Sequence, residues 1–308
     1  MRRIALMTIA AGLLISFWAV EPARALNLIS FVSHSGLDSN PCTKAAPCLT
    51  FNTAVINTVP NGVVNCLDVL DETGIPGISI QQSITIDCTG ETATLLAGNA
   101  FGGSTIDIAL PPSDVAQTVR LRGLVINGVG HAAIGISISA AGTVVLENIN
   151  IYGESQQGIL DVRTTAGSLI IKNSIISGNG GPGIVVAGAP GNAAQLDNVT
   201  SAKNTYGLAV GSGNSVQVSR STFFRNSAAG VEGDAGAQIV VDDSNISHNN
   251  IGAQSGSSIR LSNNNIAFNT TAISGASGTF GNNRFSGNGS PGTVPVPLGG
   301  ASSDLGQQ

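Results

Sequence analysis

The sequence predicts an all-β fold, a single-stranded, right-handed parallel β-helix of about 9–10 rungs with an N-terminal capping helix. Three observations predict it. Glycine is abundant, with 40 residues, whereas only 10% of the residues are charged and 4% are aromatic. Most of the chain repeats at an interval of about 20 to 25 residues. Each repeat holds three short apolar runs, which are separated by residues typical of turns.

Three columns of residues define the repeat. Short apolar-x-Asn segments recur, and their third residues are Gly123, Asn148, Asn173, Asn198, Arg220, Asp243, Asn263 and Asn282. A second column follows six residues later and consists of Asn179, Asn204, Asn226, Asn249, Asn269 and Asn288. A third column opens each unit with glycine before an apolar residue, at Gly135, Gly158, Gly183, Gly207 and Gly230.

Strands this short, at this period, favour a coil over hairpins. The rungs of such a coil pair in parallel, about 4.8 Å apart, and their inward Ile, Val and Leu side chains stack on one another. Asparagine suits the turns because it tolerates the left-handed backbone conformation and its amide can bond to the rungs on either side. A β-sandwich of many short strands is the alternative, and the fixed columns disfavour it.

The N-terminal residues 1–25 have the order of a secretory signal peptide. Arg2 and Arg3 precede an apolar run from residue 4 to residue 20, and Ala23-Arg24-Ala25 provides a cleavage site. An uncleaved membrane anchor is the alternative. We therefore expect a secreted or periplasmic protein with no membrane span after cleavage.

The remaining chain divides into three parts. Residues 26–60 are predicted to form a cap with an amphipathic helix, because Phe51, Val55, Ile56 and Val59 recur at helical spacing and Gly62 closes the helix. Residues 61–289 form the predicted β-helix. The tail, residues 290–308, is rich in Pro, Gly and Ser, and we expect it to be irregular or disordered.

All four cysteines lie near the N-terminus. An even number of cysteines in an exported chain indicates disulfides. Cys66 and Cys88 are 22 residues apart, about one rung, so their Cα atoms would stack within the range that a disulfide needs. Cys42 and Cys48 would then close a tight loop. A metal site is disfavoured because there is no C-x-x-C pair and no nearby group of histidines.

The cap and the asparagine columns resemble those of a known superfamily. The segments FVSHSGLDSNPCT at residues 31–43 and PCLTF at residues 47–51 resemble the N-terminal cap signature of pectate-lyase-like β-helix proteins. Cys42 replaces the usual glycine and Cys48 the usual aromatic residue, which fits a covalent pair. The resemblance covers almost the whole mature chain. It implies the fold but not an activity, because the superfamily holds lyases, hydrolases, epimerases and adhesins.

The charge of the chain excludes some partners. Without the three arginines and one glutamate of residues 1–25, the chain has 10 basic and 17 acidic residues. This excess of negative charge disfavours nucleic acid and anionic membranes as partners. We expect a monomer whose partner is an extracellular polysaccharide.

No complete catalytic motif is present. The polygalacturonase pattern requires a D-D pair, but in Asp242-Asp243 the second residue fills the first asparagine column, so it is interpreted as a structural substitute. Calcium-dependent pectate lyases require clustered carboxylates and a basic residue. Asp161 and Arg163 come nearest, without a second carboxylate on the next rung. We predict no metal and no cofactor, and Ca²⁺ only under the lyase alternative.

The best remaining candidates lie on the face of the first strand of each repeat. If Val231 points inward, Glu232 and Asp234 point outward, about 6.7 Å apart along the strand. This spacing is at the lower end of that used by inverting glycosidases. We expect an outer groove that passes Asp161, Arg163, Glu232 and Asp234 and binds a glycan without turnover. A polysaccharide lyase or glycoside hydrolase acting from this face, with Glu232 and Asp234 as catalytic candidates, is the alternative.

Overall fold

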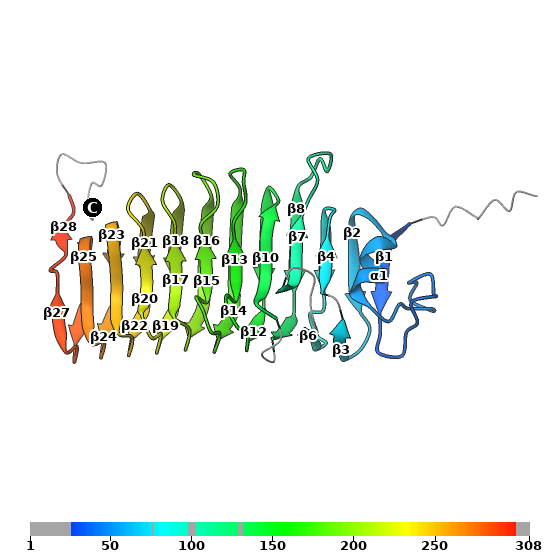
Figure 1. Ribbon diagram of the computed structural model, residues 1–308, viewed down its shortest axis with the longest axis horizontal. Helices are drawn as coiled ribbons and strands as arrows, with labels where there is room; N and C mark the ends of the chain where they lie inside the picture. Colours follow the sequence, from blue (N-terminus) through cyan, green and yellow to red (C-terminus); the bar gives the residue numbers. More distant parts are fainter. Residues whose placement is uncertain (1–25, 76, 98–102, 129–131, 300–308) are drawn as a thin grey trace, which may run out of the picture.

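The computed structural model describes residues 26–75, 77–97, 103–128 and 132–299. They form a parallel β-solenoid of about nine turns that runs from a small N-terminal cap to the strand β28 (Figure 1). All ladders between its named strands are parallel, as predicted. The expected signal peptide, residues 1–25, lies outside the described residues. Among the described residues, no helix is long and apolar enough to cross a membrane.

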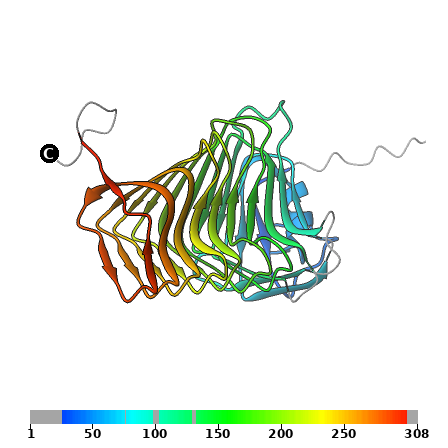
Figure 2. The ribbon, with the colours of Figure 1, turned by 60° about the vertical axis from the view of Figure 1, so that its left-hand side comes forward.

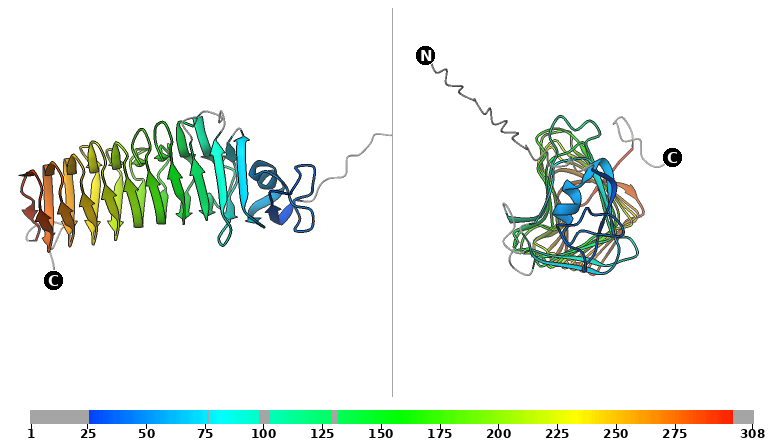
Figure 3. Two further views of the ribbon diagram at one scale, coloured as in Figure 1. Left: turned by 90° about the horizontal axis from the view of Figure 1, so that it is seen from below. Right: turned by 90° about the vertical axis from the view of Figure 1, so that its right-hand side faces the viewer.

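Three parallel sheets run along the solenoid (Figure 2), and successive rungs stack on one another when seen along its axis (Figure 3, right). The first sheet contains β4 (Ile78–Ile80), β7 (Ser104–Ala109), β10 (Ile134–Ala140), β13 (Ile159–Asp161), β15 (Ile184–Val186), β17 (Tyr206–Val210), β20 (Ala229–Gly233), β27 (Ser290–Gly292) and the first parts of β23 (Ile251–Ser262) and β25 (Thr271–Gly281).

The second sheet contains the later parts of β23 and β25, the first parts of β14 (Ser168–Ser177) and β16 (Ala193–Ala202), and β1 (Asn27–Val32), β2 (Thr58–Cys66), β5 (Ile84–Asp87), β8 (Thr118–Arg122), β11 (Thr143–Glu147), β18 (Ser215–Ser219), β21 (Gln238–Asp242) and β28 (Val296–Pro297). The third sheet contains the later parts of β14 and β16, and β3 (Leu70–Ile75), β6 (Ala93–Ala97), β9 (Leu124–Asn127), β12 (Asn150–Tyr152), β19 (Thr222–Phe224), β22 (Asn245–Ser247), β24 (Asn265–Ala267) and β26 (Arg284–Ser286).

Columns of aliphatic side chains fill the interior. In the first sheet, the fully buried residues Ile136, Ile159, Ile184, Leu208 and Val231 stand opposite one another on successive rungs. Burial of this apolar surface, at about 25 cal/mol per Å², stabilises the stack. The glycine before each of them is needed because the chain is crowded there. A Cβ atom at Gly158, for example, would lie 2.4 Å from Ile176 Cγ2.

The first predicted column forms the turn between the second and third sheets. Each of its non-glycine members has a positive φ, between 49° and 58°, at Asn148, Asn173, Asn198, Arg220, Asp243, Asn263 and Asn282. Asparagine is favoured here because it tolerates this conformation better than most residues. Asp243 accepts a hydrogen bond from the side chain of Asn263 on the next rung. Its expected role as a substitute in the column is therefore confirmed.

The second column is a buried asparagine ladder. The backbone N–H of Asn204 donates to Oδ1 of Asn226, and its Nδ2 donates to the carbonyl of Ile176, each at 3.0 Å. Asn226, Asn249 and Asn269 repeat this pattern. Each amide thus satisfies polar groups that the turn would otherwise bury without partners.

The cap contains the predicted helix in a shorter form. The helix α1 spans Phe51–Ile56 and lies across the N-terminal end of the solenoid (Figure 3). It ends at Asn57 rather than at Gly62, and Ile56 is exposed. Gly62 instead lies inside β2, where a Cβ atom would be 2.7 Å from the carbonyl oxygen of Leu28. The close pairing of β1 with β2 therefore explains this glycine.

Both predicted disulfides are confirmed. Cys42 pairs with Cys48 and Cys66 with Cys88, with Cα–Cα distances of 4.6 and 4.9 Å. The prediction for the tail is wrong at its start, because residues 290–297 include β27 and β28, which pair with β25. These strands cover backbone groups of β25 that would otherwise be exposed at the end of the solenoid. Residues 300–308 lie outside the described part of the chain.

Candidate functional site

The structure corrects the predicted position of Asp161 and Arg163. Both side chains are fully buried inside the solenoid and cannot line an outer groove. Asp161 stands opposite Val186 in the next rung, in an interior column. The reason is the alternation of side chains along a strand: Ile159 points inward, so the residue two positions later does too.

The Arg163 side chain lies inside the solenoid, at the corner between the first and second sheets. Its Nε donates to Asp161 Oδ1 at 2.8 Å and its Nη2 to Asp161 Oδ2 at 2.5 Å. Its Nη1 donates to the carbonyls of Ala141 and Ser168, at 3.1 and 3.3 Å. The guanidinium therefore pairs with a carboxylate and satisfies turn carbonyls at the same time, which is a structural role.

Glu232 and Asp234 do lie on the outer side of the first sheet. Glu232 is half-buried between Ala209 and Gln254 of the neighbouring rungs, and Asp234 is exposed. Burial and, to a smaller extent, the charge of Asp234 raise the pKa of Glu232 to about 7. Near neutral pH the Glu232 carboxyl is thus partly protonated. Whether these two residues act on a ligand stays a prediction.

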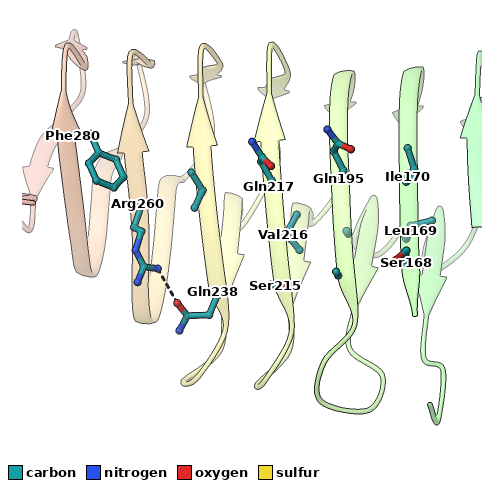
Figure 4. Close-up of a pocket in the computed structure, with 13 residues that line it drawn as sticks. Ser168, Leu169, Ile170, Gln195, Ser215, Val216, Gln217, Gln238, Arg260 and Phe280 are labelled. Carbon is teal, nitrogen blue, oxygen red and sulfur yellow. Dashed lines mark hydrogen bonds between the residues drawn. The ribbon is translucent and has the colours of Figure 1, made fainter. Parts of the chain in front are cut away.

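The neighbouring second sheet carries a groove that was not among the sites expected from the sequence. It has a volume of about 540 Å³ and crosses β14, β16, β18, β21, β23 and β25 (Figure 4). Its outward-facing lining side chains are those of Ser168, Ile170, Ala193, Gln195, Ser215, Gln217, Gln238, Val240, Arg260 and Phe280. We call this surface the second-sheet groove.

Amide side chains dominate the polar lining of the second-sheet groove. Gln195 and Gln217 are exposed and stand directly opposite each other on adjacent rungs. Within the described part of the chain, neither amide has a hydrogen-bond partner from the protein. Gln238 accepts a hydrogen bond from Nη1 of Arg260 at 2.8 Å. Each free amide offers both a donor and an acceptor to a ligand.

The sequence contains an indication of the polar side of this groove. Gln195 and Gln217 occupy the middle of apolar-x-apolar runs, between the buried Ala194 and Leu196 and between the buried Val216 and Val218. The middle position points outward, so a row of glutamines there predicts a polar stripe. No Asp or Glu lines the groove. Elsewhere, no group of three or more His, Cys, Asp or Glu among the described residues is placed to hold a metal ion.

Comparison with known proteins identifies the type of fold. A family model of the right-handed β-helix region matches residues 189–294. The structure is similar to pectate lyase Pel9A, with 15% identity, a TM-score of 0.65, and coverage of 90% of this chain and 80% of that chain. It is also similar to the alginate lyase from Paenibacillus sp. str. FPU-7, with 16% identity, a TM-score of 0.64, and coverage of 87% and 99%. The chain therefore has the right-handed parallel β-helix fold.

Other proteins of this type have different activities. The A-module of mannuronan C-5 epimerase AlgE4 from Azotobacter vinelandii is 14% identical, with a TM-score of 0.51 and coverage of 77% of this chain and 91% of that chain. A search of curated proteins finds no match to this sequence. At these identities the similarity establishes the fold alone, so a function for this β-helix has to be argued from its own residues.

Proposed function

We propose that this β-helix is a secreted, non-catalytic glycan-binding protein whose ligand lies in the second-sheet groove. The observation that carries the proposal is the row of uncharged amides, Gln195 and Gln217, with no protein partner in an open groove. Glycans present many hydroxyl groups, each both donor and acceptor, and a glutamine amide complements them in both capacities.

The dimensions of the groove support an extended ligand. Ile170, Gln195, Gln217, Val240 and Arg260 are opposite one another on five consecutive rungs. Four rung spacings correspond to about 19 Å, which is long enough for several sugar units. At one end of the groove Phe280 offers an aromatic ring for stacking (Figure 4).

One further feature supports binding without turnover, and another supports a location outside the cytoplasm. The groove lining contains no carboxylate that could act as a general acid or base on a glycosidic bond. The disulfides Cys42–Cys48 and Cys66–Cys88 are typical of an oxidising compartment. Together with the expected signal peptide, they favour a secreted or periplasmic location.

The proposal is tested by measuring the affinity of the purified protein for a panel of neutral and acidic polysaccharides. The double variant Gln195→Ala with Gln217→Ala would lose the hydrogen bonds of both amides to the glycan. Its affinity should therefore be about tenfold or more below that of the wild type. Gln156→Ala, which removes an exposed amide outside the groove, is the matched control and should bind like the wild type. Equal affinity of the groove variant and the control would overturn the proposal.

One observation favours a second candidate function, a polysaccharide lyase or glycoside hydrolase on the first sheet. The raised pKa of Glu232, about 7, would suit a general acid beside the Asp234 carboxylate. Under this alternative the wild type should release new reducing or unsaturated ends from a polysaccharide. Glu232→Gln should abolish that release while the protein stays folded.

A further inference from the structure

The turn that follows each strand of the third sheet contains unusual residues for its backbone conformation. On successive rungs, the residue before each member of the asparagine ladder or its equivalent has a positive φ. The glycines Gly153, Gly178 and Gly287 occupy this position at 78°, 68° and 66°, and between them Lys203, Arg225, His248 and Phe268 have φ of 56°, 54°, 59° and 56°. Four consecutive rungs thus place a large side chain where glycine fits best.

These residues are costly for the backbone. A bulky residue in the left-handed region costs on the order of 1 kcal/mol relative to glycine, and asparagine would reduce that cost. In the other turn of the same four rungs, asparagine occupies the equivalent position on two, at Asn198 and Asn263, and Arg220 and Asp243 occupy it on the two between them. The fold itself does not need large side chains at this position, because glycine occupies it at Gly153, Gly178 and Gly287, so their presence on four neighbouring rungs favours a role in contact with a partner.

The side chains of Phe224, Arg225, His248 and Phe268 form one continuous row, and Lys203 lies on the rung before Arg225. The ring of His248 lies 5.2 Å from that of Phe224 and 5.1 Å from that of Phe268, centroid to centroid. The guanidinium of Arg225 lies 5.1 Å from the centroid of Phe224. Phe268 is 58% exposed, and Lys203, Arg225 and His248 are exposed as well. We call Lys203, Phe224, Arg225, His248 and Phe268 the turn stripe.

The turn stripe is locally positive on an acidic protein. The segments 199–211, 221–231, 244–259 and 263–283 contain no Asp or Glu, although the chain has 18 acidic residues. Three other cations, Arg122, Arg163 and Arg220, form ion pairs with carboxylates. Among the described residues, neither Lys203 nor Arg225 forms an ion pair with a carboxylate. The positive charge of the stripe therefore stays available to a partner.

We infer that the turn stripe is a second binding site, for an anionic polysaccharide with carboxylate or sulfate groups. Lys203 and Arg225 lie on adjacent rungs, and neighbouring rungs are spaced about 4.8 Å apart. Their positive charges would attract the anionic groups of the polysaccharide. The exposed ring of Phe268 offers an apolar face to a sugar ring, and the neighbouring cation strengthens binding of a negatively charged chain. The stripe uses charge and aromatic surface, whereas the second-sheet groove uses amides, so this inference does not depend on the proposed function.

The test compares binding of polygalacturonate, dextran sulfate, neutral dextran and a DNA duplex to three proteins. The proteins are the wild type, Lys203→Asn with Arg225→Asn, and the control Arg220→Asn. Asparagine suits the left-handed conformation, so the double variant should not melt at a lower temperature than the wild type. Arg220 is a matched control because it is exposed and has the same backbone conformation, φ 49°, in the other turn.

We expect both anionic polysaccharides to bind the wild type more tightly than neutral dextran, and more weakly as salt is added. The double variant should lose about tenfold in affinity for them, corresponding to two exposed charges, and the control should not. Equal binding by the double variant and the wild type would overturn the inference. So would binding of neutral dextran as tightly as the anionic polymers, or binding of the DNA duplex alone.

Discussion

Asp161 and Arg163 form a bidentate ion pair inside the solenoid, and both side chains are fully buried. A pair of this kind holds its corner of the coil, because each charge is removed from water and neutralised by the other, and the guanidinium also donates to turn carbonyls. The sequence places a hydrophobic residue in the same interior column on the following rungs, at Val186 and Val210. The ion pair therefore stabilises the rung of Asp161 at the position where hydrophobic packing stabilises the next two rungs.

Removal of one member of this pair should be strongly destabilising. We expect Asp161→Val to lower the free energy of unfolding by about 3–5 kcal/mol, because it leaves Arg163 buried and unpaired. The double variant Asp161→Val with Arg163→Met should recover part of this loss, since no buried charge remains. Urea denaturation of the three proteins measures both effects. A loss below about 1 kcal/mol in Asp161→Val would show that the pair is not buried in solution.

The asparagine ladder should contribute measurably to stability. Asn204→Ala removes the acceptor of the Asn179 N–H and a donor to the carbonyl of Ile176. We expect a loss of about 1–3 kcal/mol and a lower melting temperature. Asn40→Ala, which loses one partly exposed bond to the carbonyl of Pro47, should have a much smaller effect. Equal and negligible shifts for both variants, measured by thermal denaturation, would contradict the role of the ladder.

Glu154 occupies the N-terminal end of this ladder. Its N–H donates to Asn179 Oδ1, but both of its carboxyl oxygens are buried without a hydrogen-bond partner. Burial raises its pKa to about 8. The folded state therefore retains a proton that the unfolded state releases near the ordinary glutamate pKa of about 4.3. Because the folded state binds more protons, stability falls as the pH rises between these two values.

Replacement of Glu154 should remove this pH dependence. Glu154→Gln keeps the shape of the side chain and carries no charge at any pH. We expect the variant to be more stable than the wild type at pH 8.5 by more than about 1 kcal/mol, and the difference to shrink at pH 5. Melting temperatures of the two proteins across this range provide the measurement. A difference that does not vary with pH would show that Glu154 titrates normally.

The disulfide between Cys66 and Cys88 should stabilise the start of the solenoid. It closes a segment with a sequence separation of 22 residues. Loss of a crosslink of this length costs about 3 kcal/mol in the chain-entropy description, and Cys66→Ala with Cys88→Ala should show it in denaturation. Mass spectrometry of a non-reduced tryptic digest checks the pairing in the purified protein. A peptide that links Cys48 to Cys66 would contradict it.

The fold could be predicted because its repeat appears directly in the sequence. Asparagine and glycine mark the turns, and the alternation around Ile159 and Val231 assigns the inward faces. The same alternation also places Asp161 inside, although charged residues are rarely buried, so the residue type and the position indicate opposite orientations. Buried ion pairs depend on the carbonyls around them, which the sequence does not reveal.

The complete groove and the turn stripe are harder to predict, for other reasons. The positions of Gln195 and Gln217 indicate a polar stripe, but the groove also depends on the sizes of side chains on several neighbouring rungs, such as Phe280. The stripe depends on a left-handed backbone at residues such as Arg225 and Phe268, whose types do not indicate that conformation. Only the three-dimensional register brings these side chains into one row.

Measurement of binding and product release in one sample distinguishes glycan binding without turnover from catalysis. The polysaccharide from the panel that binds most tightly is incubated with the wild type, and the bound fraction is followed together with new reducing and unsaturated ends. We expect stable binding, reduced in Gln195→Ala with Gln217→Ala, and no release of product. Product release that is lost in Glu232→Gln with Asp234→Asn, while that variant stays folded, would contradict the account and establish an enzyme that acts from the first sheet.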